Sequence, residues 1–188
     1  MDSYGTRGQI VRAADELFYH KGFEHTSFSD IASAVRISRG NFYYHFKSKD
    51  EILAAVIEMR LAERRNLLRQ WEAMERSPAG RIRCYIRIVI DNQREIERSG
   101  CPVGTLTTEL SKLGHASRWP AVEIFTLFRD WLREQFEALG RHSDADSLAM
   151  HVIAVSQGIA TLSNAYKDRD FVEREVDQLC AWVDAQMA

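Results

Sequence analysis

The densest group of hydrogen-bond donors in this sequence lies in the stretch ISRGNFYYHFKSKDEIL, residues 37–53. Guanidinium, amide, phenol, imidazole and ammonium groups occur there on Arg39, Asn41, Tyr43, Tyr44, His45, Lys47 and Lys49. Phosphate oxygens accept hydrogen bonds from such groups, and Arg and Asn side chains also reach base edges. Because no carboxylate in an evident cleft stands beside His45 as a general base, we expect binding of an anionic surface rather than catalysis. The alternative is that Tyr43 and Tyr44 simply pack in the core.

Cysteine is the second candidate for chemistry. The three cysteines are odd in number and widely spaced, at Cys84, Cys101 and Cys180. This pattern argues against a disulfide framework and against paired C-x-x-C zinc ligands. Capping and helix-surface positions explain the one mixed group of His and Asp, at His142, Asp144, Asp146 and His151. We therefore predict neither a metal site nor a bound cofactor.

The charge of the whole chain gives no sign of a nucleic-acid partner. It is −2, from 25 Lys and Arg against 27 Asp and Glu. Any DNA-binding surface must therefore be local. Within residues 1–50 two of the acidic residues, Asp15 and Glu16, fall on the first predicted helix, whereas Arg39, Lys47 and Lys49 cluster together. This distribution favours a local DNA-binding face.

The composition is that of a globular protein with a real core, since 45% of the 188 residues are apolar and 28% are charged. No apolar run reaches the roughly 18 residues that a membrane helix needs. The N-terminus lacks the pattern of a signal peptide. We therefore expect a cytoplasmic protein with no membrane partner.

Apolar residues recur at helical spacing almost throughout, and no convincing period of two indicates a strand. We predict an all-α protein of about nine helices, with a three-helix DNA-binding domain at residues 1–50 and a larger helical domain at residues 51–188. Gly22 ends the first helix with a positive φ, Ser27 and Asp30 form a capping box for the second, and Ser38 caps the third. The longer helices are expected at about 48–75, 79–98, 105–113, 119–139, 144–166 and 169–187.

Residues 28–46, FSDIASAVRISRGNFYYHF, have the dimensions of a helix-turn-helix. In this motif the second helix enters the DNA major groove with its N-terminus first, while the first helix crosses the backbone. Ile37, Phe42 and Phe46 can face inward and leave the polar side chains outside. Gly40 has no side chain, so another backbone can approach it closely.

The longer stretch FSDIASAVRISRGNFYYHFKSKDEIL resembles the DNA-binding domain of the tetracycline-repressor (TetR) family. The shared pattern is a helix with Ile-Ala, a turn, and then Ser-basic-Gly-x-aromatic-Tyr-x-His-Phe-x-Ser/Thr-Lys. The resemblance implies a double-stranded DNA operator as the partner. It implies contacts to phosphates, or to the thymine methyl region, from Thr26, Ser27, Tyr43, Tyr44, His45 and Lys49. It implies contacts to bases and backbone from Ser38, Arg39, Gly40 and Asn41.

The same family dimerises through its last two helices, which form a four-helix bundle. The resemblance therefore implies a homodimer, and the residues that would supply its interface are Val152, Val155, Ile159, Leu162, Val176, Leu179 and Val183. The alternative is that these apolar stripes close the core of the protomer itself. Because helix-turn-helix units usually read paired half-sites, we favour a dimer with two-fold symmetry.

Aromatic and polar residues of the second half have the composition of a pocket for a drug-sized apolar ligand. The candidates are Tyr85, Trp119, Phe125, Phe128, Trp131, Gln157 and Asn164. Plain core packing of these side chains is the alternative.

Cys101 lies in ERSGCPVGTLTTELSKLG, which resembles a TetR sub-branch with Gly-Cys-x-x-Gly-x-Leu-x-x-Glu after the fifth helix. In parts of that branch the cysteine lies at the inducer pocket and senses electrophiles or oxidants. A position near the N-terminus of the helix starting at Thr105 would favour the thiolate, with Arg98 and His115 as positive neighbours. A small buried hydrophobe is the alternative reading of Cys101.

These features predict a homodimeric, ligand-responsive transcriptional repressor. It would bind a palindromic operator and release it when an unidentified small-molecule inducer, or modification of Cys101, favours a conformer with mis-spaced recognition helices. Two other classes stay open at this point. One is an enzyme that uses a Cys101–His115 thiol dyad, and the other is a helical ligand- or partner-binding protein that does not read DNA.

Overall fold

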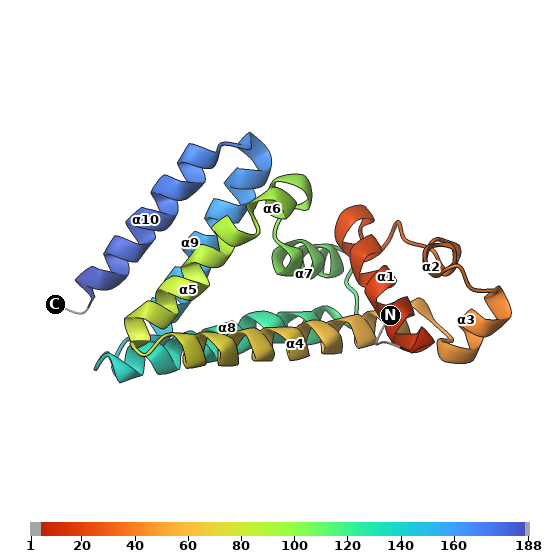
Figure 1. Ribbon diagram of the computed structural model, residues 1–188, viewed down its shortest axis with the longest axis horizontal. Helices are drawn as coiled ribbons and strands as arrows, with labels where there is room; N and C mark the ends of the chain where they lie inside the picture. Colours follow the sequence, from red (N-terminus) through yellow and green to blue (C-terminus); the bar gives the residue numbers. More distant parts are fainter. Residues whose placement is uncertain (1–4, 187–188) are drawn as a thin grey trace. The chain divides into compact units, whose positions relative to one another are not determined.

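The computed structural model describes residues 5–186, which form helices joined by short connections (Figure 1). The all-α prediction is confirmed. In chain order the helices are α1 (Thr6–Lys21), α2 (Phe28–Val35), α3 (Arg39–His45), α4 (Lys49–Met74), α5 (Pro78–Asp91), α6 (Gln93–Ser99), α7 (Pro102–Lys112), α8 (Arg118–Ala138), α9 (Ala145–Tyr166) and α10 (Arg169–Ala185).

Two helix boundaries differ from the prediction. The helix expected over 79–98 is interrupted at Asn92, between α5 and α6, so the described residues form ten helical segments. The Asn92 side chain donates a hydrogen bond to the Ile88 carbonyl at 2.8 Å, which competes with continuation of the helical ladder. α7 begins at Pro102, earlier than the expected residue 105, because proline suits the first turn of a helix.

The chain divides into two compact units. The first contains the residues up to Glu63 together with Thr105–Glu123, and the second contains Arg64–Gly104 together with the chain from Ile124 onward. α4, α7 and α8 are continuous helices with residues in both units. The domain boundary at residues 50 and 51 stays a prediction, while the compact units divide α4 further along, between Glu63 and Arg64.

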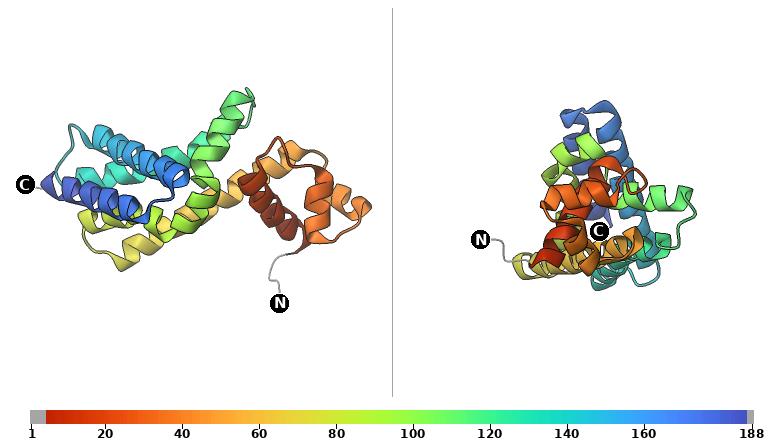
Figure 2. Two further views of the ribbon diagram at one scale, coloured as in Figure 1. Left: turned by 90° about the horizontal axis from the view of Figure 1, so that it is seen from above. Right: turned by 90° about the vertical axis from the view of Figure 1, so that its right-hand side faces the viewer.

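Local caps and one apolar cluster hold the first unit together. Ser27 and Asp30 form the predicted capping box at the start of α2, and Gly22 ends α1 with φ 89°. α1, α2 and α3 lie together in Figure 2. Their apolar faces, with those of α4 and α7, form a core that includes Ile10, Phe18, Phe23, Ile31, Phe42, Phe46, Ile52, Leu53, Leu106 and Leu110.

In the second unit α9 and α10 form an antiparallel pair, and α5 packs against both (Figure 2). The buried side chains of these three helices include Ile82, Ile86, Val89, Val152, Ile159, Val172, Val176, Leu179 and Val183. Across residues 5–186, no helix combines the length and the apolar character that crossing a membrane requires.

Candidate nucleic-acid interface and ligand cavity

The turn between α2 and α3 is made by Arg36, whose left-handed backbone (φ 58°) ends α2. Ser38 then caps α3 by accepting a hydrogen bond from the Asn41 N–H at 3.3 Å. Phe42 and Phe46 are buried in the core of the first unit, as predicted from their spacing. Because these two rings fix the inner face of α3, the first turn of α3 and the two tyrosines, Tyr43 and Tyr44, are left at the surface.

The exposed face of α3 carries most of the predicted DNA-binding residues. Tyr43 exposes 47% and Tyr44 78% of its surface, so the alternative that both pack in the core is wrong. Gly40 and Asn41 are exposed, and the Asn41 side-chain amide has no hydrogen-bond partner within residues 5–186. His45 is half-buried with its ring against that of Tyr44. Arg39 opens α3, and its side chain lies outside the described part of the structure.

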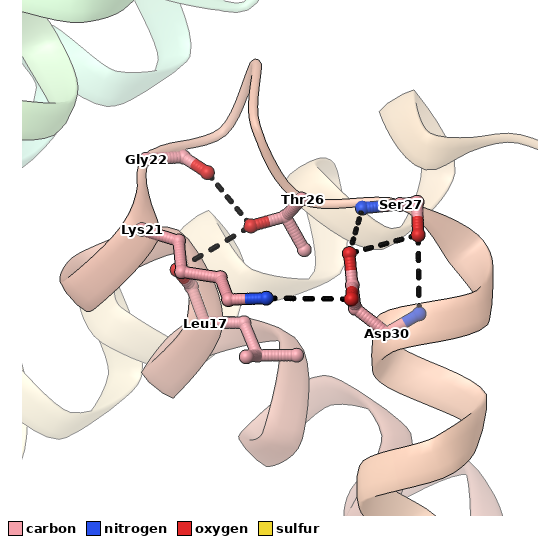
Figure 3. Close-up of polar contacts among 6 residues, drawn as sticks. All are labelled: Leu17, Lys21, Gly22, Thr26, Ser27 and Asp30. Atoms are coloured by element: carbon pink, nitrogen blue, oxygen red, sulfur yellow. Dashed lines mark hydrogen bonds and ion pairs between the residues drawn. The ribbon is translucent and has the colours of Figure 1, made fainter.

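Thr26 requires a correction, because the structure leaves it no free group for a phosphate. Its side chain is buried, and its hydroxyl donates to the Gly22 carbonyl at 2.7 Å, with the Leu17 carbonyl at 3.4 Å (Figure 3). The residue therefore joins the end of α1 to the start of α2. A threonine at a predicted helix start does not by itself show whether its hydroxyl turns outward or inward.

Ser27 is exposed, but its hydroxyl is committed to the capping box (Figure 3). It donates to Asp30 Oδ2 at 2.8 Å and accepts from the Asp30 N–H at 3.1 Å. The Ser27 N–H and hydroxyl, with the ammonium of Lys21, lower the pKa of the Asp30 carboxyl to about 2. An ionised carboxylate thus stands beside Ser27, which makes its hydroxyl a poor phosphate ligand.

Lys49 and Glu109 both bind the backbone of the connection between α1 and α2. Lys49 binds its carbonyl groups, and Glu109 binds its N–H groups. The Lys49 ammonium donates to the carbonyls of Phe23 at 2.9 Å and Glu24 at 3.3 Å, and it lies 4.3 Å from the centre of the Phe23 ring. The Glu109 carboxylate accepts from the N–H groups of the same two residues, both at 2.9 Å. Lys49 thus has a structural role, and its contact with phosphate stays a prediction.

Glu109 is the residue that the sequence reasoning missed. Its signal was present, since it is the final residue of the Gly-Cys-x-x-Gly-x-Leu-x-x-Glu pattern. A carboxylate that accepts two backbone hydrogen bonds replaces the partners that these amides would find in water.

We expect Glu109→Ala to lower the free energy of unfolding by about 2 kcal/mol, because it leaves the amides of Phe23 and Glu24 without their charged acceptor. Urea unfolding followed by circular dichroism measures this loss. Glu123→Ala is the control, because it removes an exposed carboxylate of the same unit. Equal stability of the two variants would show that the Glu109 contacts contribute nothing.

A cavity in the second unit encloses about 600 Å³ of space outside the protein atoms, part of it open to solvent. The space fully enclosed by the protein is about 70 Å³, less than the usual 300–1,000 Å³ of small-molecule sites, so a drug-sized ligand has to widen the cavity or extend into its open part. It is lined by Arg64, Tyr85, Ile88, Val89, Asn92, Ile96, Cys101, Pro102, Val103, Phe125, Phe128, Ser156, Gln157 and Ala160. Five predicted pocket residues thus come together here, namely Tyr85, Cys101, Phe125, Phe128 and Gln157, and their role in ligand binding stays a prediction.

Two N–H groups point at the Cys101 sulfur inside this cavity. Gly104 donates its backbone N–H at 3.5 Å, and Gln157 donates through Nε2 at 3.4 Å. The buried Tyr85 ring packs edge to face on Phe128, with centroids 5.1 Å apart. Burial, and secondarily the nearby Cys101, raise the pKa of the Tyr85 hydroxyl above its usual value. Tyr85 therefore stays protonated and can donate to a ligand.

Three predicted pocket residues do not line this cavity. Trp119 is 63% exposed and stacks under the Arg118 guanidinium. Trp131 is buried, and its indole N–H donates to Glu72 at 2.7 Å. Asn164 donates to the carbonyls of Ile96 and Glu97, both at 3.1 Å, and so satisfies the C-terminal end of α6. Aromatic or polar residues at helical spacing show that they share one face of a helix, but not whether that face meets a cavity, another helix or solvent.

The predicted dimer residues are mostly core residues of the protomer. Val152 and Ile159 on α9 and three residues of α10 are buried within the unit, the latter being Val176, Leu179 and Val183. These five are therefore corrected from a dimer interface to the packing of α5, α9 and α10. Leu162 is 41% exposed and Val155 is half-buried, so only these two of the set are accessible.

His115 is engaged within the first unit. Its Nδ1 accepts from the Ser117 N–H at 3.0 Å, and its Nε2 lies 3.3 Å from Asp50 Oδ1. Neither ring nitrogen is left to act as the base of a thiol dyad. The Asp residues that the sequence placed near His142 are also occupied, because Asp144 pairs with Arg141 and Asp146 pairs with Arg129.

Two family models match the chain. The first, bacterial regulatory proteins of the tetR family, covers residues 10–56, and the second, the C-terminal domain of LmrA/YxaF-like transcriptional regulators, covers residues 78–178. The exposed helix-turn-helix thus falls in the first matched region, and the residues lining the cavity fall in the second except for Arg64, which lies between the two.

Individual proteins are similar over most of the chain. An HTH-type transcriptional regulator in the lacX 3′ region of Lactococcus lactis subsp. lactis is 32% identical over 93% of this chain and 91% of its own. The transcriptional repressor DhaR of Mycobacterium sp. strain GP1 is 24% identical over 87% of this chain and 85% of its own. A TetR transcriptional regulator from Legionella pneumophila has a similar crystal structure, with a TM-score of 0.84, 25% identity and full coverage of both chains.

Proposed function

The chain belongs to the TetR family of bacterial transcriptional regulators, and from that premise we propose a homodimeric repressor that releases a palindromic operator when a small molecule fills the cavity. The observation that carries the DNA-binding part is α3, where buried Phe42 and Phe46 leave Asn41, Tyr43 and Tyr44 exposed. Repression rather than activation is supported by the similar protein DhaR, which is a repressor. Operator binding places the protein with the DNA, in the cytoplasm.

The dimer proposal rests on the outer face of α9. Met150 and Leu162 expose 44% and 41% of their surfaces, and Tyr166 exposes 75%. Exposed apolar side chains gathered on one helix of a soluble domain mark an interaction surface. A second copy of this chain is the occupant we propose, because a palindromic operator requires two recognition helices held at a fixed spacing.

A ligand releases DNA only if it binds the two conformers with different affinities. α7 is the element that supports such coupling. Pro102 and Val103, at its start, line the cavity, and Glu109, further along the same helix, holds the amides of Phe23 and Glu24. We expect an occupied cavity to displace α7 and so shift the population of DNA-binding conformers.

The test is a fluorescence-anisotropy titration of the protein against DNA from upstream of its own gene and against scrambled DNA. We expect preferential binding whose affinity falls by roughly 10³-fold between 50 and 200 mM salt, since several phosphate contacts release counterions. Equal, weak binding to both DNAs would call for selection from random sequences. Failure of that selection to enrich any sequence would contradict operator binding.

An electrophile- or oxidant-triggered repressor is the second candidate. The observation that favours it is the position of Cys101 in the cavity wall, with two N–H groups directed at its sulfur. In this case N-ethylmaleimide releases the operator from the wild-type protein and not from Cys101→Ser. Equal release from both proteins would exclude Cys101 as the trigger.

A further inference from the structure

The cavity wall carries polar side chains of two kinds. Gln157 and Asn92 each donate one amide N–H, to Cys101 and to the Ile88 carbonyl, and each also has an amide oxygen that can only accept. Arg64, Tyr85 and Ser156 remain. Within residues 5–186 their side-chain polar groups have no hydrogen-bond or ion-pair partner.

Ser156 is the most informative of the three. Its side chain is 2% exposed, and its Oγ is one of the few buried polar atoms in the described chain without a hydrogen-bond partner. Most buried hydroxyls have a partner, so an unpartnered one in a cavity wall is available to a group supplied from outside the protein.

Arg64 gives the wall of this cavity a positive charge. It is half-buried in α4, and no Asp or Glu is among the residues that line the cavity. The other wall residues include Ile88, Val89, Val103 and Phe128, which offer no compensating charge. A guanidinium facing such walls attracts an anion and offers it a planar fork of donors.

We propose that this cavity binds a small amphipathic anion, whose acidic group meets Arg64 and the hydroxyls of Tyr85 and Ser156 and whose apolar body lies on the aromatic wall. A carboxylate or sulfonate has the acceptor atoms that this donor set requires. The Tyr85 and Phe128 rings provide the surface for the body. The inference rests on the proposed function only where it identifies this anion with the inducer.

Two dyes that share one aromatic body form the test. 8-Anilinonaphthalene-1-sulfonate carries a sulfonate, and N-phenyl-1-naphthylamine lacks it. In fluorescence titrations of the wild-type protein we expect the anion to bind at least about 10-fold more tightly than the neutral dye. Arg64→Gln should weaken binding of the anion by about 10-fold and leave the affinity for the neutral dye within about two-fold.

The control variant is Arg65→Gln, which removes a neighbouring exposed guanidinium of α4 that does not line the cavity. Ser156→Ala should weaken binding of the anion by about three-fold, since it removes one neutral hydrogen bond. If the Arg64 side chain only reaches solvent, Arg64→Gln and Arg65→Gln will bind the anionic dye with the same affinity. That result, or equal loss of both dyes in Arg64→Gln, would overturn the proposal.

Alkylation locates the bound dye. Cys101 lines the cavity whereas Cys84 does not, so bound anion should slow the reaction of iodoacetamide with Cys101 only. Binding without this protection would place the dye elsewhere and contradict the proposal. Operator titrations with saturating anion distinguish the anion site from its role in induction. If dye binding depends on Arg64 but does not release the operator, the cavity binds an anion that is not the inducer.

Discussion

Replacement of Asn41 by alanine is expected to weaken binding to the specific operator by roughly 10- to 100-fold, from base contacts worth about 1–3 kcal/mol each. Asn41 lies in the first turn of α3, the part of a recognition helix that meets base edges. Its side chain is exposed and its amide makes no hydrogen bond within the described chain, so we expect the substitution to leave the fold intact. The loss therefore falls on DNA recognition alone.

The measurement is the anisotropy titration with specific and scrambled DNA at one salt concentration. Gln70→Ala is the matched control, because it removes an exposed amide from α4 in the second unit. We expect scrambled DNA to bind Asn41→Ala and the wild-type protein alike, since phosphate contacts supply most non-specific affinity. Equal loss on both DNAs would mean that Asn41 contacts the backbone and reads no base.

Gly158→Glu is expected to convert the dimer into a monomer and to weaken binding of the full palindrome by roughly 100-fold or more, because the two half-sites then bind independently. Gly158 lies on the exposed side of α9, where an added Cβ atom would meet no atom of another element within 4 Å. Glutamate also favours a helix over glycine by about 0.5–1 kcal/mol. The substitution thus places a charge on the proposed interface without disturbing the protomer.

Light scattering coupled to size-exclusion chromatography distinguishes the monomer, at 21.6 kDa, from the dimer. Gly158→Ala is the control, because it adds a methyl group and no charge, and we expect it to stay dimeric. If Gly158→Glu is also dimeric, the outer face of α9 is not the interface. If the wild-type protein itself is a monomer in solution, the proposal of a homodimer is wrong.

The features that could be predicted correctly from the amino-acid sequence have local causes. The capping box of Ser27 and Asp30, the positive φ of Gly22 and the burial of Phe42 and Phe46 were all predicted and confirmed. Each depends on residues within a few positions, through a cap, a backbone preference or a helical period. The DNA-binding motif was recognisable for the same reason, because its surface lies on one short segment.

The partner of each side chain, by contrast, depends on how distant helices pack against one another. Lys49 and Glu109 meet at the Phe23–Glu24 connection although they are far apart in the chain. Thr26 turned inward, and five of the residues predicted to form a dimer interface turned out to be core. An apolar stripe or a polar group in the sequence specifies one side of a contact, and the packing of distant helices supplies the other. The unpartnered donors of Arg64, Tyr85 and Ser156 were for this reason visible only in the folded cavity.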